Sequence, residues 1–172
     1  MLDALIKDCS KSEKKLAKEN IENVSKILDL QNCIIIFDRG YPGIDLIWYL
    51  EKLKIKYIFR LQTKMYDREK TLMKAEDEWI DLKVNGDRLR KLTDEKVKNE
   101  LKSQKTLKVR MSKIILDTGE IEYLLSNISE NIILPTEMKE TEFKTSNTKE
   151  VVPAEKCRSN NRKYKYIRKY RE

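Results

Sequence analysis

The sequence of 172 residues contains no histidine, and its three cysteines, Cys9, Cys33 and Cys157, are far apart. Because zinc sites are built from histidines and closely spaced cysteines, we do not expect one. Widely spaced cysteines are typical of reduced thiols in the cytosol. No apolar run approaches the roughly 20 residues that cross a bilayer, and the N-terminus lacks the basic start and apolar core of a signal peptide. We therefore expect a cytoplasmic protein with no membrane partner.

Charge is abundant and unevenly placed. The chain has 37 Lys and Arg against 29 Asp and Glu, a net charge of +8, and a mean hydropathy of −0.69. Most of the excess lies between Lys156 and Glu172, which holds eight basic residues and one acid, while the remainder is almost neutral. A basic surplus favours polyanion partners such as nucleic acid. For the end of this tail, residues 163–172, we expect disorder or a frayed helix.

The organising stretch is the apolar run of residues 33–37, which leads directly into Asp38 and a Gly-Tyr-Pro-Gly turn. An unbroken apolar run predicts a strand that is covered on both faces. Helical periodicity predicts helices over residues 12–29 and 44–54, and a second strand follows at 56–62. A strand, a helix and a strand in about thirty residues predict a parallel βαβ unit and an α/β fold.

The two predicted helices carry apolar stripes that should face the sheet. The stripes are Leu16, Ala17, Ile21, Val24, Ile27 and Leu28 in the first helix, and Ile44, Ile47, Leu50 and Leu53 in the second.

Residues 63–127 form a β-rich block. Alternation predicts strands at 79–84, 105–116 and 120–127, and the last two should form an antiparallel hairpin around a turn at 117–119. Asn85-Gly86 is the strongest hairpin signal, although residues 88–102 after it are helix-prone. Trp79 could stack on a displaced base, but a lone Trp in an alternating strand more often belongs to the core. A further helix is predicted over 136–144.

Asp38 has two interpretations. A carboxylate at the carboxyl end of a parallel strand lies where α/β folds place functional groups, and its hard oxygens suit Mg²⁺. Alternatively, Asp38 caps the turn or forms a salt bridge with Arg39 or Arg60. One carboxylate cannot form a two-metal site, which needs several acids around ions about 3.5–4 Å apart.

The stretch Asp38-Arg39-Gly40-Tyr41-Pro42, with residues 57–61 after the helix, resembles the central part of bacterial insertion-sequence transposases. These are DDE-superfamily enzymes with a ribonuclease H-like core, in the group with the Tyr-Arg-Glu-Lys signature. Residues 120–127 resemble the strand that closes the family's β-rich insertion, and residues 136–140 the start of its last catalytic helix. The resemblance covers about residues 1–143.

The resemblance implies three acids that hold Mg²⁺ ions for phosphodiester hydrolysis and transesterification in DNA transposition. Asp38 matches the second acid, and the first is expected upstream of Met1. By position the third falls at Lys149 or Glu150, of which only Glu150 has suitable chemistry, and the signature around it departs from the family. Contacts to DNA phosphates are implied for Arg39, Tyr41, Arg60 and Lys64, although Tyr41 could instead pack under the turn and Arg60 could pair with a carboxylate.

We therefore expect a partial ribonuclease H-like core over 1–62, a β-rich insertion over 63–127, a returning helix over 128–145 and an irregular basic C-terminal tail over 146–172. The expected function is that of a DDE transposase, with DNA of transposon ends as partner and a nucleoid location when bound. We expect the chain alone to be an inactive remnant, truncated or frameshifted after Phe143. The alternatives are a non-catalytic fragment that binds DNA, dimerises or associates with intact transposase, and an unrelated small α/β domain with a structural Asp38.

Overall fold

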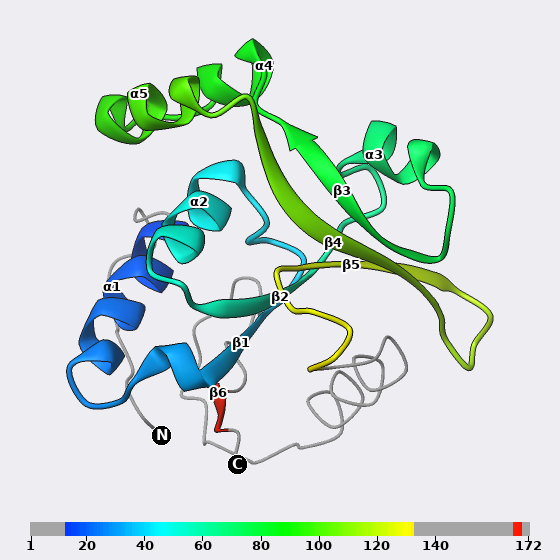
Figure 1. The fold of residues 1–172 in the computed structure, drawn as a ribbon, viewed down its shortest axis with the longest axis horizontal. Helices are drawn as coiled ribbons and strands as arrows, with labels where there is room; N and C mark the ends of the chain where they lie inside the picture. Colours follow the sequence, from blue (N-terminus) through cyan, green and yellow to red (C-terminus); the bar gives the residue numbers. More distant parts are fainter. Residues whose placement is uncertain (1–12, 133–166, 170–172) are drawn as a thin grey trace, which may run out of the picture.

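The structure is a computed structural model that describes residues 13–132 and 167–169 (Figure 1). Its elements in chain order are α1 (Glu13–Ser25), the 3-10 helix η1 (Leu30–Asn32), β1 (Cys33–Phe37), α2 (Ile44–Lys52), β2 (Lys56–Arg60), α3 (Asp67–Leu72), β3 (Asp77–Lys83), α4 (Gly86–Arg90), α5 (Glu95–Ser103), β4 (Thr106–Ile115), β5 (Ile121–Ser126) and β6 (Ile167–Lys169). Across these described ranges the strands make one mixed sheet in the order β3-β4-β5-β2-β1-β6.

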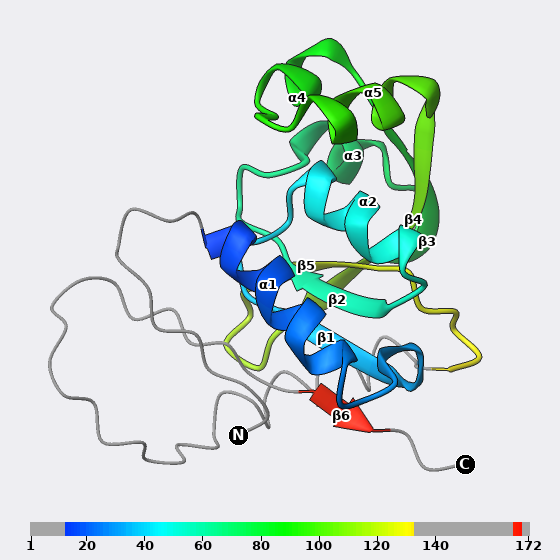
Figure 2. The ribbon, with the colours of Figure 1, turned by 90° about the vertical axis from the view of Figure 1, so that its left-hand side faces the viewer.

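The β1–α2–β2 unit is the centre of the fold and confirms the predicted α/β class with a partial ribonuclease H-like core. β1 and β2 pair in parallel, and α2 connects them. Helices α1 and α2 lie together against one side of these strands (Figure 2). Phe37 and Phe59, paired across the two strands, stack with ring centroids 4.6 Å apart beneath the helices. This packing fixes the carboxyl ends of both strands at the same edge.

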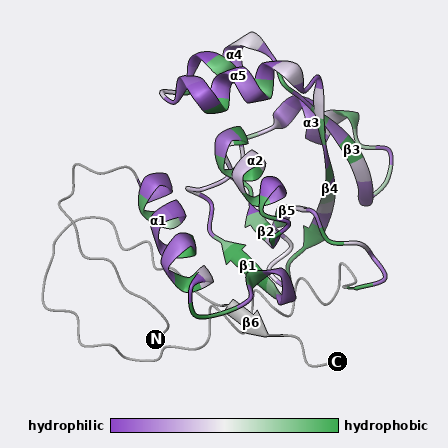
Figure 3. Cartoon of the chain, turned by 60° about the vertical axis from the view of Figure 1, so that its left-hand side comes forward, coloured by the Kyte–Doolittle hydropathy of each residue, from purple (hydrophilic) through white to green (hydrophobic). Residues whose placement is uncertain are grey.

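Both faces of β1 are buried, as its unbroken apolar run predicted. Cys33 and Ile35 join the larger core with α1 and α2, whereas Ile34 joins a second cluster with Ile58 and Leu124 on the opposite face. In Figure 3 the central strands β1 and β2 are largely green, whereas α1 and α5 are mostly purple.

The predicted apolar stripes are correct within the helices, and beyond their ends Leu28 still packs against the core whereas Ile27 and Leu53 do not. α1 ends at Ser25, so Ile27 lies outside the helical period and is 74% exposed. α2 ends at Lys52, and Leu53 is 41% exposed for the same reason. Leu46, which the predicted stripe omitted, is fully buried because the second helix packs on more than one neighbour.

The predicted hairpin at 105–127 is confirmed as β4 and β5, which pair antiparallel around a turn where Gly119 adopts φ +82°. β4 also pairs with β3, and β5 pairs antiparallel with β2. The strands of the β-rich block therefore extend the core sheet. The division of the chain at residues 62 and 127 stays a prediction.

Asn85-Gly86 does not form a hairpin turn. Asn85 caps α4, and its side chain accepts a hydrogen bond from the backbone N–H of Arg88 at 3.0 Å. The helix-prone segment after it forms α4 and α5, so β3 reaches its partner β4 only after two helices. Side-chain capping and helix propensity outweigh the turn preference of the dipeptide here.

Trp79 is not a core residue. It lies on the face of β3 that also carries Asp77, is 38% exposed, and has the Lys108 ammonium 5.9 Å from its ring centre. Leu82, three residues along, is the fully buried side chain of β3. Because side chains alternate along a strand, the two residues face opposite sides of the sheet.

Three residues of the basic tail form a strand, where disorder or a frayed helix was expected. β6 pairs antiparallel with Cys33–Ile35 of β1, along the edge that β2 does not occupy. The predicted helix at 136–144, Glu150 and the rest of the tail lie outside the described residues. Within the described ranges, no helix has the length and apolar character needed to span a membrane.

Candidate functional site

The candidate site lies where β1 and β2 end side by side. Asp38 follows β1 directly, and Arg60 is the last residue of β2, one step beyond the paired Phe37 and Phe59. The parallel register therefore brings the two side chains together, with Arg60 Nη1 3.8 Å from Asp38 Oδ1. The same Asp38 oxygen accepts a hydrogen bond of 2.7 Å from the backbone N–H of Arg39. Asp38 remains 43% exposed, so a ligand can reach it.

A second acid, Glu122, organises this edge. It belongs to β5, whose Leu124 pairs with Arg60, and side-chain alternation places Glu122 on the same face as Leu124. Its Oε1 accepts hydrogen bonds from Arg60 Nε at 2.9 Å, Arg60 Nη2 at 2.5 Å and Arg39 Nη2 at 2.8 Å. The side chain is only 3% exposed. Two guanidinium groups are thus held on one buried carboxylate oxygen.

Sequence reasoning predicted the strand that carries Glu122 but missed its role. The available signal was a single carboxylate between Ile121 and Tyr123 in a strand whose last three residues are buried. Because a buried carboxylate is stable only when it is paired, such a position predicts a cationic partner. It does not predict which cation, since Arg60 is 62 residues away in the sequence.

The structure brings together three of the predicted site residues, Asp38, Arg39 and Arg60. Tyr41 is 3% exposed, and its ring lies 5.8 Å from that of Phe37, which favours packing under the turn over contact with DNA. Lys64 is exposed in the segment after β2, and no ion pair joins it to Asp38.

The described residues around Asp38 do not fit a metal ion by themselves. No group of three or more Asp, Glu, His or Cys that could hold a metal occurs within residues 13–132 and 167–169. The Arg60 guanidinium lies 3.8 Å from Asp38, and Glu122 Oε1 already accepts three hydrogen bonds. Among the described residues, a cation at Asp38 would therefore meet the positive charge of Arg60 and a single accessible carboxylate.

The chemistry that this edge offers is the binding of an oxyanion. Arg39 is 49% exposed and Arg60 26% exposed, while their common carboxylate is buried. A guanidinium carries five N–H donors in a planar fork, and the recorded bond from Arg39 to Glu122 uses one of them. Such a group can bind Glu122 and a phosphate oxygen at the same time.

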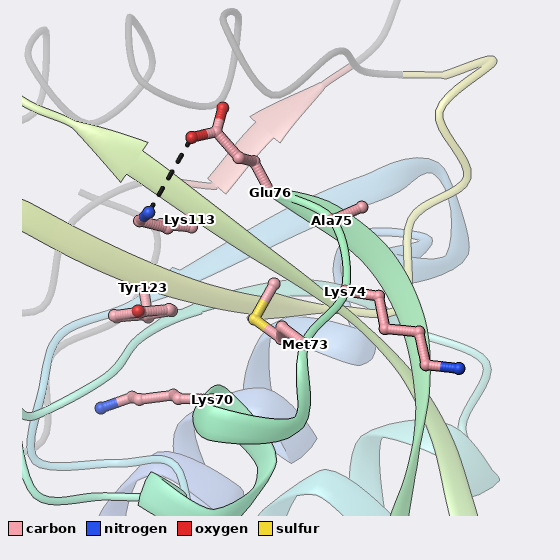
Figure 4. A pocket seen from close by; sticks show the side chains of 7 residues that line it. All are labelled: Lys70, Met73, Lys74, Ala75, Glu76, Lys113 and Tyr123. Atoms are coloured by element: carbon pink, nitrogen blue, oxygen red, sulfur yellow. Dashed lines mark ion pairs between the residues drawn. The ribbon is translucent and has the colours of Figure 1, made fainter.

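A pocket of about 290 Å³ lies beside Tyr123, the neighbour of Glu122 that faces the other side of the sheet (Figure 4). Lys70 Nζ sits 5.0 Å from the Tyr123 ring centre and donates to the carbonyls of Gln62 and Thr63 at 2.8 and 2.7 Å. Burial lowers the pKa of Lys70. Its ammonium group therefore holds the segment after β2, two and three residues beyond Arg60 in the chain.

A second buried charge holds the β-rich strands together. Arg110 of β4 is 1% exposed and forms a two-pronged contact with Asp77 of β3, at 2.9 Å from Nε and 2.7 Å from Nη2. Its Nη1 donates to the carbonyl of Ile128 at 3.0 Å, and Ser112 Oγ donates to Asp77 at 2.6 Å. This network is remote from Asp38 in the sheet order and has a structural role.

Comparison with known proteins gives one result. A family model described as "Transposase DDE domain" matches residues 1–160. No curated protein and no solved structure matches the chain. The match spans Asp38, Arg39, Arg60 and Glu122, so the whole candidate site lies inside the matched region.

Proposed function

We propose, because this chain belongs to the transposase DDE domain family, that it binds the phosphate backbone of DNA at the edge formed by Arg39 and Arg60. The family supports a transposase-type function and normally works with a divalent metal. The observation that carries the proposal is the convergence of two partly exposed guanidinium groups on Glu122, with that of Arg60 also 3.8 Å from Asp38. Arginine and lysine side chains make most of the contacts that proteins form with DNA phosphates. Lys64, which is exposed just after β2, is proposed as a further phosphate contact.

We also propose that this edge does not hold the two metal ions of a DDE active site by itself. Asp38 occupies the position of a family metal ligand, but two-metal phosphoryl transfer needs several carboxylates that converge on the ions. Among the described residues, Asp38 is joined by two arginines and by a glutamate that is already hydrogen-bonded to them. We therefore propose that the chain binds DNA and that its described residues do not hold two catalytic ions by themselves.

Binding without cleavage has a consequence for an intact transposase in the same bacterial cell. A chain that occupies transposon ends and does not cut them acts as a competitor, and it is associated with the nucleoid while bound.

Arg39→Ala is expected to lower the affinity for DNA and to make that affinity less dependent on the salt concentration. Each lost phosphate contact should reduce the slope of log K against log [salt] by about 0.9. The measurement is fluorescence anisotropy of a labelled duplex over a range of salt concentrations. Arg90→Ala is the matched control, because Arg90 is 79% exposed on α4 and the same charge is removed there. Equal effects of the two variants, or no salt-dependent binding by the wild type, contradict the proposed contact.

The cleavage prediction uses a supercoiled plasmid that carries the terminal inverted repeats, with Mg²⁺. Wild type and Asp38→Ala are both expected to leave it uncut at the background rate, because one accessible carboxylate does not hold two ions. Agarose gels read the nicked and linear products over time. Nicking that depends on Mg²⁺ and disappears in Asp38→Ala would show an active site that the described residues do not supply.

A further inference from the structure

We propose that Glu122 is the positioning residue of the DNA-binding edge: its buried carboxylate holds the Arg39 and Arg60 guanidinium groups in the arrangement that receives a DNA phosphate. This inference rests on the proposed function, and it assigns a role to a residue that touches no DNA. Three N–H donors from two arginines converge on its Oε1, at 2.5 to 2.9 Å.

The geometry separates Glu122 from the ligand. Its side chain is 3% exposed, whereas that of Arg39 is 49% exposed. The carboxylate therefore lies behind the guanidinium groups, which present their outer edges to solvent. A phosphate reaches the arginines and does not reach the acid.

The carboxylate is needed because the two arginines carry like charges. Guanidinium groups that share one acceptor oxygen repel each other unless a negative charge lies between them. Asp38 does not replace Glu122 in this respect, since it is 3.8 Å from Arg60 and contacts Arg39 through the backbone N–H. Without Glu122, the half-exposed Arg39 side chain would spread over many rotamers, and ordering it again on binding costs free energy.

A change in net charge and a loss of positioning predict opposite changes in DNA affinity when Glu122 is replaced. Removal of an acid beside two phosphate-binding arginines raises the local positive potential, so charge alone predicts tighter DNA binding. Loss of a positioning residue predicts weaker binding and a smaller salt dependence, because the arginines no longer meet the phosphate together. The direction of the change therefore separates the two explanations.

The test compares Glu122→Gln with Glu120→Gln by anisotropy on the same duplex. Glu120 is an exposed acid next to the same strand, so its substitution changes the net charge equally. Glu122→Gln is expected to bind about tenfold more weakly at about 50 mM salt, with a slope smaller by up to about 1.8 for two lost phosphate contacts. Glu120→Gln should bind like wild type or slightly more tightly. If Glu122→Gln also binds as tightly as wild type, the inference is wrong.

Two further variants protect the test against a folding defect. In a double-mutant cycle, Arg39→Ala should weaken binding in the wild type and have little further effect in Glu122→Gln, because both remove the same arrangement.

Arg39→Lys leaves the buried acid in place and keeps the charge, but it lacks the planar fork that serves two acceptors. We expect it to lose most of the affinity that Arg39→Ala loses, with an unchanged thermal unfolding midpoint. Wild-type affinity of Arg39→Lys would overturn the positioning role by itself.

The outcomes distinguish this inference from the proposed function. Absence of salt-dependent binding by the wild type removes both. Binding by the wild type that weakens in Arg39→Ala but not in Glu122→Gln or Arg39→Lys keeps the DNA-binding edge and removes the role of Glu122.

Discussion

Asp77→Ala is expected to lower the free energy of unfolding by about 3–5 kcal/mol, as the loss of one partner of a buried ion pair does. The reason is the partner, since Arg110 is 1% exposed and its Nε and Nη2 both bind Asp77. After the substitution a buried guanidinium keeps only its bond to the Ile128 carbonyl among these contacts. Urea denaturation followed by circular dichroism measures the change.

The double variant Asp77→Ala, Arg110→Met identifies the cause of that loss. It removes both charges and keeps an unbranched side chain at the buried position, so a large part of the lost stability should return. If the double variant is as unstable as Asp77→Ala, the buried charge is not the origin of the effect. If Asp77→Ala lowers the free energy of unfolding by less than about 1 kcal/mol, the Asp77–Arg110 pair contributes no more than an exposed salt bridge does.

The same pair gives the stability a defined dependence on pH. Burial raises the pKa of Asp77, but hydrogen bonds from Arg110 and Ser112 outweigh this effect, so its pKa lies below the usual 3.8. The folded state therefore binds this proton less tightly than the unfolded state does. The contribution is complete above pH 3.8 and is lost as the pH falls through the lower folded value. Asp77→Asn should flatten the acid limb of the stability curve.

Phe59→Ala is expected to lower the free energy of unfolding by about 3–5 kcal/mol, because it removes a fully buried aromatic ring from the centre of the sheet. The ring stacks on Phe37 at 4.6 Å and lies 5.0 Å from Tyr57, so its loss leaves a cavity that the paired strands cannot close. Urea denaturation again supplies the measurement.

Leu72→Ala is the control for that experiment, since Leu72 is a large apolar side chain that is 66% exposed. Its substitution should change the stability by no more than about 0.5 kcal/mol. Phe59→Leu, which keeps most of the apolar volume, should cost less than the alanine variant. Equal losses for Phe59→Ala and Leu72→Ala would contradict the packing of β2 against the helices.

Much of the fold follows from local sequence patterns. The apolar run of residues 33–37 has no polar position, so it predicts a strand covered on both sides. The helical period of residues 44–54 between two strands leads to a parallel pair, since a crossover helix returns the chain in the same direction. The errors at Ile27 and Leu53 arise because the apolar period of each stripe continues past the last helical residue, and periodicity does not mark where a helix stops.

The β-rich block shows where local patterns stop being sufficient. Asn85-Gly86 suits a tight turn, but its outcome depends on the following residues, which form helices. The half-exposed position of Trp79 depends on the register between β3 and β4. Neither is encoded in the few residues around it.

The part of the candidate site that lies at the ends of β1 and β2 was predictable from the sequence. Asp38 and Arg60 close two parallel strands, so their proximity follows from the βαβ unit. Glu122 belongs to β5. The pairing of β5 with β2 depends on the strand order of the whole sheet and joins residues at the two ends of the β-rich block. The sequence therefore predicts a functional edge at Asp38 and leaves out the acid that organises it.

The pairing of β5 with β2 also bears on the order in which the chain folds. The β4–β5 hairpin closes through a short turn and needs only local contacts, whereas β2 and β5 meet across the long stretch from Arg60 to Leu124. Closing a longer loop costs more chain entropy, so we expect the hairpin to form early and to dock on β2 later. The contact between Glu122 and the two arginines then forms in the docking step. A chain that stops before that step has a complete hairpin and a complete βαβ unit, and no assembled site for a phosphate.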